Sequence, residues 1–171
     1  MNRIVVARWQ EDTSWTRLAR WPTYVVQKGQ QMPNEGREPA SFLWYILNKG
    51  IRPDDTYAFV QGDPFAHGVT MTDFREVDEY TPLGTWEVEC DDQGAPHHPG
   101  LPMQQKWDDW IGGPRPDAYK FVAGGQFLVP GHVIHQHPKA KYRYLLDEMS
   151  IGSNPWVMER LFPYLWSTGR A

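Results

Sequence analysis

The strongest constraint on the fold is the alternation of short apolar runs with helix-like segments in the N-terminal third of the chain. Ile4–Ala7, Thr23–Gln27 and Tyr57–Val60 are rich in β-branched and aromatic residues, which is typical of buried strands. A short helix is predicted over Trp15–Ala19 and a longer one over Ala40–Asn48. The order strand, helix, strand, helix, strand predicts an α/β fold, with a mixed, mostly parallel sheet flanked by helices.

The middle of the chain is punctuated by Gly and Pro. Residues 68–118 show helical periodicity only around Lys106–Ile111, so we expect an ordered, loop-rich insertion with one short helix. Beyond it, two strands and two helices are predicted, over Lys120–Ala123, Gln126–Val129, His135–Met149 and Pro155–Leu165, the first of these helices after Pro138. No repeat or linker divides the sequence, and residues 1–171 are therefore expected to form a single domain.

Charge and cysteine content limit the class of protein. The formal net charge is −4, with acids and bases interspersed, so avid non-specific binding to nucleic acid or to anionic membranes is not expected. Cys90 is the only cysteine, which excludes an intrachain disulfide and favours a reducing compartment. No run of roughly 18 apolar residues is present. We expect a soluble, cytoplasmic protein without a membrane span.

Polar clusters follow the predicted strands. Open α/β sheets bind ligands at the carboxyl ends of their strands. Three clusters occupy such positions: Arg8 with Glu11 and Asp12, then Gln61-Gly62-Asp63, and, if Thr85–Val88 is a strand, Cys90-Asp91-Asp92. We expect these clusters to converge on one ligand site.

Asp63 and His67 form the most specific pair of candidate metal ligands. A carboxylate oxygen and an imidazole nitrogen suit a borderline cation such as Mn²⁺ better than Ca²⁺. Two ligands do not hold Mn²⁺ or Mg²⁺ tightly, so phosphate oxygens of a bound ligand would have to complete the coordination. The alternative is structural, with Asp63 capping a turn and His67 bonded to a backbone carbonyl.

Arg37 and Glu38 stand just before the predicted helix at residue 40. The planar guanidinium of Arg37 matches a phosphate or carboxylate, although a structural pair with Glu35 or Asp63 would explain it equally well. Glu38 is placed to stabilise the positive end of the helix dipole.

Two late features complete the set of candidate residues. Gly124 and Gly125 precede a strand, where they allow either close approach of a ligand or a tight bend. Glu159 lies beside Arg160 in an otherwise apolar helix. It is a candidate general base or acceptor for a substrate hydroxyl, and a solvated charged stripe is the alternative.

An ordered series of motifs resembles the uncharacterised family called domain of unknown function 3431. The series runs nearly end to end and comprises VVARWQEDTSW (5–15), NEGRE (34–38), FVQGDPFAH (59–67), CDDQGAPH (90–97), AGGQFLV (123–129) and MERLFP (158–163). The family name implies no activity.

More distantly, the chain is similar to nucleotide-sugar glycosyltransferases of the GT-A type, which implies an abbreviated version of that fold. In those enzymes an Asp-x-Asp motif binds a divalent metal that holds the donor's diphosphate. The resemblance implies that Asp63 stands at the metal-binding acid, that Gly124 and Gly125 border the donor sugar and the acceptor, and that Glu159 is the late acid. Gln61-Gly62-Asp63 supplies one acid where that family has two.

These observations predict a small glycosyltransferase-like enzyme that transfers a sugar from a nucleotide-sugar donor to a hydroxyl acceptor with Mn²⁺ or Mg²⁺. Asp63 and Glu159 are its expected catalytic residues, and Asp63 and His67 its metal ligands. The expected donor and phosphate contacts are Arg8, Glu11, Asp12, Arg37, Gln61, Gly124 and Gly125. One alternative is a non-enzymatic module that binds a sugar, nucleotide or protein through the aromatic-rich residues 84–118. Another is a modifier of nucleic-acid bases, which the charge does not indicate.

Overall fold

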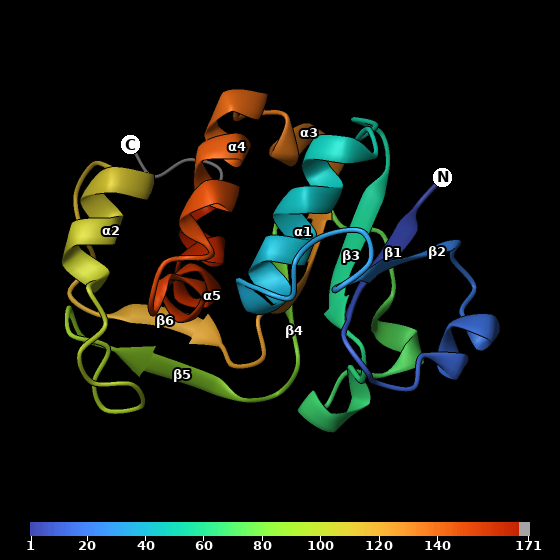
Figure 1. The fold of residues 1–171 in the computed structure, drawn as a ribbon, viewed down its shortest axis with the longest axis horizontal. Helices are drawn as coiled ribbons and strands as arrows, with labels where there is room; N and C mark the ends of the chain where they lie inside the picture. Colours follow the sequence, from blue (N-terminus) through green and yellow to red (C-terminus); the bar gives the residue numbers. More distant parts are fainter. Residues whose placement is uncertain (168–171) are drawn as a thin grey trace.

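A five-stranded sheet forms the centre of the computed structural model, which describes residues 1–167. Its order is β2-β1-β3-β7-β4 (Figure 1). The strands are β1 (Arg3–Arg8), β2 (Thr23–Gln27), β3 (Thr56–Gln61), β4 (Thr81–Leu83) and β7 (Gln126–Pro130). β1 pairs in parallel with β2 and β3, whereas β7 runs antiparallel to β3 and β4. Since only β7 is reversed, the predicted mixed, mostly parallel sheet is confirmed.

A separate two-stranded antiparallel sheet and the helices complete the fold. The second sheet pairs β5 (Glu87–Cys90) with β6 (Tyr119–Val122). The helices are α1 (Arg37–Asn48), α2 (Met103–Trp110), α3 (Gly131–Ile134), α4 (Lys139–Glu148) and α5 (Asn154–Leu165), with 3-10 turns η1 (Ser14–Leu18), η2 (Phe65–His67) and η3 (Met71–Asp73). In Figure 1 the two-stranded β5–β6 sheet lies at the opposite end of the molecule from β1 and β2. No helix within residues 1–167 is long and apolar enough to cross a membrane.

Alternate residues of the central strands belong to two different apolar clusters. Val5 and Phe59 face the large cluster that α1 and α5 cover, while Ile4 and Ala58 face a smaller one on the other side of the sheet. This period of two follows from the pleat of a strand. Both faces of the strands are buried, which explains why their sequences are continuous apolar runs rather than alternating ones.

Phe127 of β7 is the centre of the aromatic packing that fixes α5 on the sheet. Its ring lies 4.9 Å from the ring of Phe162 and 5.0 Å from that of Trp166, with Phe42 of α1 at 5.7 Å. All four side chains are fully buried. The position of α5 relative to β7 is therefore set by interlocked rings.

The insertion at residues 68–118 holds more regular structure than predicted. α2 matches the expected short helix, but β4 and β5 also fall within the segment. β4 was missed because Pro82 lacks a donor and disfavours a strand, and β4 accommodates it at the edge of the sheet. The strand expected over Thr85–Val88 lies at β5, and the segment Lys120–Ala123 pairs as β6 with β5 instead of joining the main sheet.

Proline marks the start of the last two helices. The helix in the segment His135–Met149 begins after Pro138, as predicted, because Pro138 is extended and serves as the N-cap of α4 at Lys139. Pro155 lies in the first turn of α5, as predicted. The segment predicted as a helix at Trp15–Ala19 is the 3-10 turn η1.

Replacing Phe127 tests the aromatic packing. We expect Phe127→Ala to lower the free energy of unfolding by about 3–5 kcal/mol, because it removes a fully buried ring and leaves a cavity. Urea unfolding followed by circular dichroism measures this loss. Tyr144→Ala, at a side chain that is 41% exposed on α4, is the matched control and should change the stability by about 0.5 kcal/mol or less. Equal effects of the two changes would contradict the assigned core.

Candidate active site at the carboxyl edge of the sheet

The carboxyl ends of the parallel strands meet at one edge of the sheet. β1 and β2 end side by side at Arg8 and Gln27, and Ala7 lies beside Gln61 at the end of β3. β7 begins at the same edge with Gln126. The Oε1 of Gln126 accepts a hydrogen bond from the Gln61 backbone N–H at 3.0 Å. The side chain of Gln126 therefore closes the gap between β3 and β7 where their ladder ends.

The backbone of Gly124 joins this edge to α5. Its carbonyl accepts a hydrogen bond from Gln61 Nε2 at 2.7 Å, and its N–H donates to Glu159 Oε1 at 2.7 Å. The sequence predicted Gln61, Gly124 and Glu159 from three separate motifs, and the structure brings them into direct contact.

The two glycines are required by both conformation and space. Gly124 and Gly125 have φ of +102° and +59°, values that favour glycine. A Cβ on Gly124 would lie 3.2 Å from the His67 ring, and one on Gly125 would lie 3.1 Å from Glu159 Cγ. The glycines thus form the tight bend that the sequence allowed, and they also permit His67 and Glu159 to approach the loop.

Asp63 and His67 flank the short turn that follows β3. The His67 N–H donates to the Pro64 carbonyl at 3.2 Å, and both predicted metal ligands are exposed. Within residues 1–167 neither side chain makes a hydrogen bond or ion pair. The Asp63 carboxylate therefore does not cap the turn, and the His67 imidazole does not bond to a backbone carbonyl.

Asp63 and His67 alone do not form a complete site for a divalent metal. No group of three or more His, Cys, Asp or Glu side chains in the described part of the chain could hold such an ion. Asp63 and His67 therefore suit a metal only when phosphate oxygens and water fill the remaining positions, as the sequence implied.

Arg8 and Glu11 order the loop after β1. Arg8 donates from Nε to the Glu11 carbonyl and from an Nη to Gln27 Oε1, each at 2.8 Å. Glu11 accepts from the Trp9 N–H at 2.7 Å. Although partial burial opposes it, backbone N–H groups and the positive charge of Lys28 hold the pKa of Glu11 below its ordinary value.

The loops after β1 and β3 pack against each other, as predicted. A Cβ on Gly62 would lie 2.7 Å from that of Glu11, and Trp15 Nε1 donates to the Gly62 carbonyl at 2.8 Å. Asp12 has a local role. The N–H and the hydroxyl of Ser14 bond to its carboxylate and lower its pKa, and this interaction orders the start of η1.

Arg37 and Glu38 occupy the N-terminal turn of α1. Arg37 stacks on Trp156 of α5 at 5.0 Å, and its Nε lies 3.5 Å from Glu38, so neither Glu35 nor Asp63 is its partner. Glu38 also lies 3.6 Å from the buried Lys28 at the end of β2. Its placement at the helix N-terminus is confirmed. Lys28 was overlooked, although it directly follows the predicted strand Thr23–Gln27.

The third polar cluster does not join this site. β5 belongs to the separate sheet, where Asp92 accepts hydrogen bonds from Arg115 at 3.0 Å and from the Tyr119 hydroxyl at 2.8 Å. Asp91 accepts from the N–H groups of Gln93 and Ala95. Both acids order the loop after β5, so the expected convergence of all three clusters is wrong for this one.

Arg160 is buried beneath the same sheet, which argues against a solvated stripe on α5. Its two Nη atoms donate to the Trp156 carbonyl and to His98 Nδ1, each at 2.7 Å, and its guanidinium lies over the Phe121 ring. Glu159 and Arg160 therefore point to different surroundings. Glu159 reaches the Gly124 loop and Arg160 anchors α5 to the second sheet.

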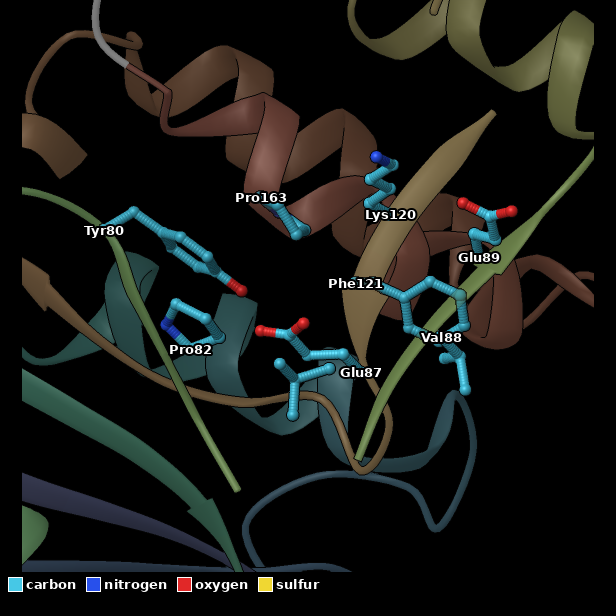
Figure 2. A pocket seen from close by; sticks show the side chains of 9 residues that line it. Tyr80, Pro82, Glu87, Val88, Glu89, Lys120, Phe121 and Pro163 are labelled. Carbon is cyan, nitrogen blue, oxygen red and sulfur yellow. The ribbon is translucent and has the colours of Figure 1, made fainter. Parts of the chain in front are cut away.

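A cavity of about 570 Å³ lies between β4 and the two-stranded β5–β6 sheet. Figure 2 shows that the Tyr80 hydroxyl and the Glu87 carboxylate are directed into it. Pro163 of α5 also lines the cavity. The sequence offered no signal for it, because its walls combine residues from distant segments, some from predicted elements such as Phe121 and Pro163 and some from a segment that was predicted as irregular, such as Tyr80.

No protein-family model, no curated protein and no solved structure matches this chain.

Substitution of Glu159 tests the contact with the Gly124 loop. Glu159→Ala leaves the Gly124 N–H without its acceptor, so we expect amide exchange at Gly124 to accelerate and stability to fall by about 1 kcal/mol. Glu159→Gln keeps an acceptor oxygen and should preserve the protection. Hydrogen exchange followed by NMR distinguishes the two variants. Equal exchange in both would show that this bond does not order the loop.

The thiol of Cys90 is expected to be unreactive in the folded protein. Burial raises its pKa, an effect that nearby Arg160 only partly opposes, so little thiolate forms near neutral pH. Labelling with Ellman's reagent at pH 7.5 should be slow in the native protein and fast in urea. Rapid labelling without denaturant would contradict the buried position.

Proposed function

We propose that the protein is a small glycosyltransferase-like enzyme that uses a nucleotide-sugar donor and a hydroxyl acceptor. One observation carries the proposal. Gln61, Gly124 and Glu159 are linked by hydrogen bonds at the carboxyl edge of the sheet, on the same edge as Asp63 and His67. Open α/β sheets bind ligands at this edge, and the weaker GT-A resemblance assigns roles to Asp63, Gly124 and Glu159 among these five residues.

The donor would lie over the ends of β1 and β2 and the start of α1. Arg8, Lys28 and Arg37 supply positive charge there, and Trp156 offers an aromatic face beside Arg37. Asp63 and His67 would hold a Mn²⁺ or Mg²⁺ ion, which neutralises the donor's diphosphate when bound. Gln61 and the glycine loop would border the sugar.

Glu159 is suited to the transfer step. One carboxylate oxygen is held by the Gly124 N–H, and Oε2 lies 3.8 Å from Arg160. The acceptor oxygen would attack the anomeric carbon as its proton passes to Glu159. The bond from that carbon to the diphosphate breaks, and its electron pair leaves with the nucleoside diphosphate. Gly124 would fix the orientation of the base.

The alternative of a non-enzymatic binding module is favoured by the cavity beside β4, whose walls are mainly apolar side chains. A module of this kind would bind its ligand regardless of metal and of Asp63. Metal dependence therefore separates the two functions.

A thermal-shift screen of nucleotide sugars, with and without Mn²⁺, tests the proposal. A ligand at 100 times its dissociation constant adds about 2.7 kcal/mol. For a domain of this size, that corresponds to a rise in melting temperature of roughly 5–11 °C. We expect such a rise with Mn²⁺ and one class of nucleotide sugar, and its loss in Asp63→Asn.

Asp54→Asn is the matched control, because Asp54 is an exposed acid before β3, at the opposite end of that strand. It should retain the full shift. A shift that persists without metal and in Asp63→Asn would support the binding module instead. The absence of any shift across nucleotide sugars would contradict the proposed donor class.

A further inference from the structure

The cavity between β4 and the two-stranded β5–β6 sheet has the size of a small-molecule site. Its volume of about 570 Å³ falls within the range of roughly 300–1,000 Å³ that is typical of ligand pockets. Tyr80 and Pro82 lie on one side and Phe121 on the other (Figure 2), and Val122 and Pro163 of α5 also line the cavity. The walls are thus mainly apolar and come from both sheets and one helix.

Two polar groups face this cavity without partners. The Tyr80 ring is held by Phe127 at 5.3 Å and Trp166 at 6.1 Å, which fixes its hydroxyl toward the cavity. Within residues 1–167 neither this hydroxyl nor the Glu87 carboxylate makes a hydrogen bond or ion pair. Burial, with the charge of Glu159, raises the pKa of Tyr80, so the hydroxyl stays protonated and can donate.

The cavity adjoins the proposed catalytic base. Pro163 lines it and follows Glu159 by four residues on α5, so the two lie on the same side of that helix. Val122 also lines the cavity, and it lies two residues before Gly124, whose N–H donates to Glu159. Glu159 is not itself a lining residue, but its charge acts on the Tyr80 hydroxyl that faces the cavity, so Glu159 lies near the Tyr80 end.

The charges around the cavity favour an uncharged ligand over an anion. Glu89 lies directly opposite Lys120 in the register of β5 and β6, so their charges offset each other. Glu87 lies opposite the apolar Val122 and remains uncompensated. The Glu87 side of the cavity is therefore negative, which disfavours carboxylates, phosphates and nucleic acid.

We propose that this cavity binds the acceptor, an uncharged and largely apolar small molecule with a hydroxyl group that is presented to Glu159. The role of this molecule as an acceptor rests on the proposed glycosyl transfer. The binding site itself depends only on the shape and lining of the cavity. The Tyr80 hydroxyl orients the polar end of the molecule, and the apolar walls bind its body.

Isothermal titration with 2-naphthol and with the isosteric anion 2-naphthoate tests the site. We expect the wild-type protein to bind 2-naphthol at least tenfold more tightly than 2-naphthoate. Glu87→Trp, at an exposed strand position, should fill the cavity and abolish binding of 2-naphthol. Glu87→Gln is its matched control, because it removes the charge without filling the space. It should keep 2-naphthol binding and weaken discrimination against the anion.

Tyr80→Phe removes only the hydroxyl and should weaken 2-naphthol binding about five- to tenfold. Circular dichroism and thermal melts establish that each variant is folded. Equal affinity for 2-naphthoate, no measurable binding of 2-naphthol, or unchanged binding in Glu87→Trp would each overturn the proposal.

The same variants separate this inference from the proposed function. Glu87→Trp should keep the metal-dependent shift with a nucleotide sugar, because Glu87 lies outside the donor side of the site. If 2-naphthol binds as expected while every nucleotide sugar fails, the cavity is a ligand site and the glycosyl-transfer function is wrong. If nucleotide sugars bind and 2-naphthol does not, the cavity proposal alone fails.

Discussion

The candidate site depends on the backbone of one residue, Gly124. Its carbonyl is bound by the side chain of Gln61 at the end of β3, and its N–H by the carboxylate of Glu159 on α5. These two bonds connect a strand, a loop and a helix that are far apart in the sequence. Neither residue can be moved without releasing the loop, so the distance from the sheet edge to Glu159 is fixed by a single short chain of hydrogen bonds.

That chain is useful only because α5 itself is held rigidly. The rings of Phe162 and Trp166, at the end of α5, pack against Phe127 of β7. The buried Arg160 contacts His98 and Phe121. A catalytic carboxylate on a mobile helix would lose its orientation toward a reacting hydroxyl. The large number of aromatic residues therefore contributes to the site indirectly, through the placement of the helix that carries Glu159.

The sequence predicted what depends on local pattern. Continuous apolar runs identified β1, β2, β3 and β7, and strand ends identified Gln61 and Asp63. It failed where the outcome depends on pairing between distant segments. β4 is only three residues long with a central proline, and the choice of β6 to pair with β5 instead of joining the main sheet leaves no local trace. The cavity that these strands enclose was therefore invisible, as was the burial of Lys28.

The two sides of Glu159 differ in charge. Arg8, Lys28 and Arg37 lie on the side of β1, β2 and α1 together with the acids Glu11, Asp12 and Glu38, while Glu87 lies uncompensated in the cavity on the side of β4 and β5. An anionic donor would be disfavoured beside Glu87, whereas an uncharged acceptor would not. Because the Gly124 loop lies between the two regions, one acid can face both. Under the proposed function, the net charge of −4 does not exclude a phosphate-containing donor, since local arrangement and not total charge decides where an anion binds.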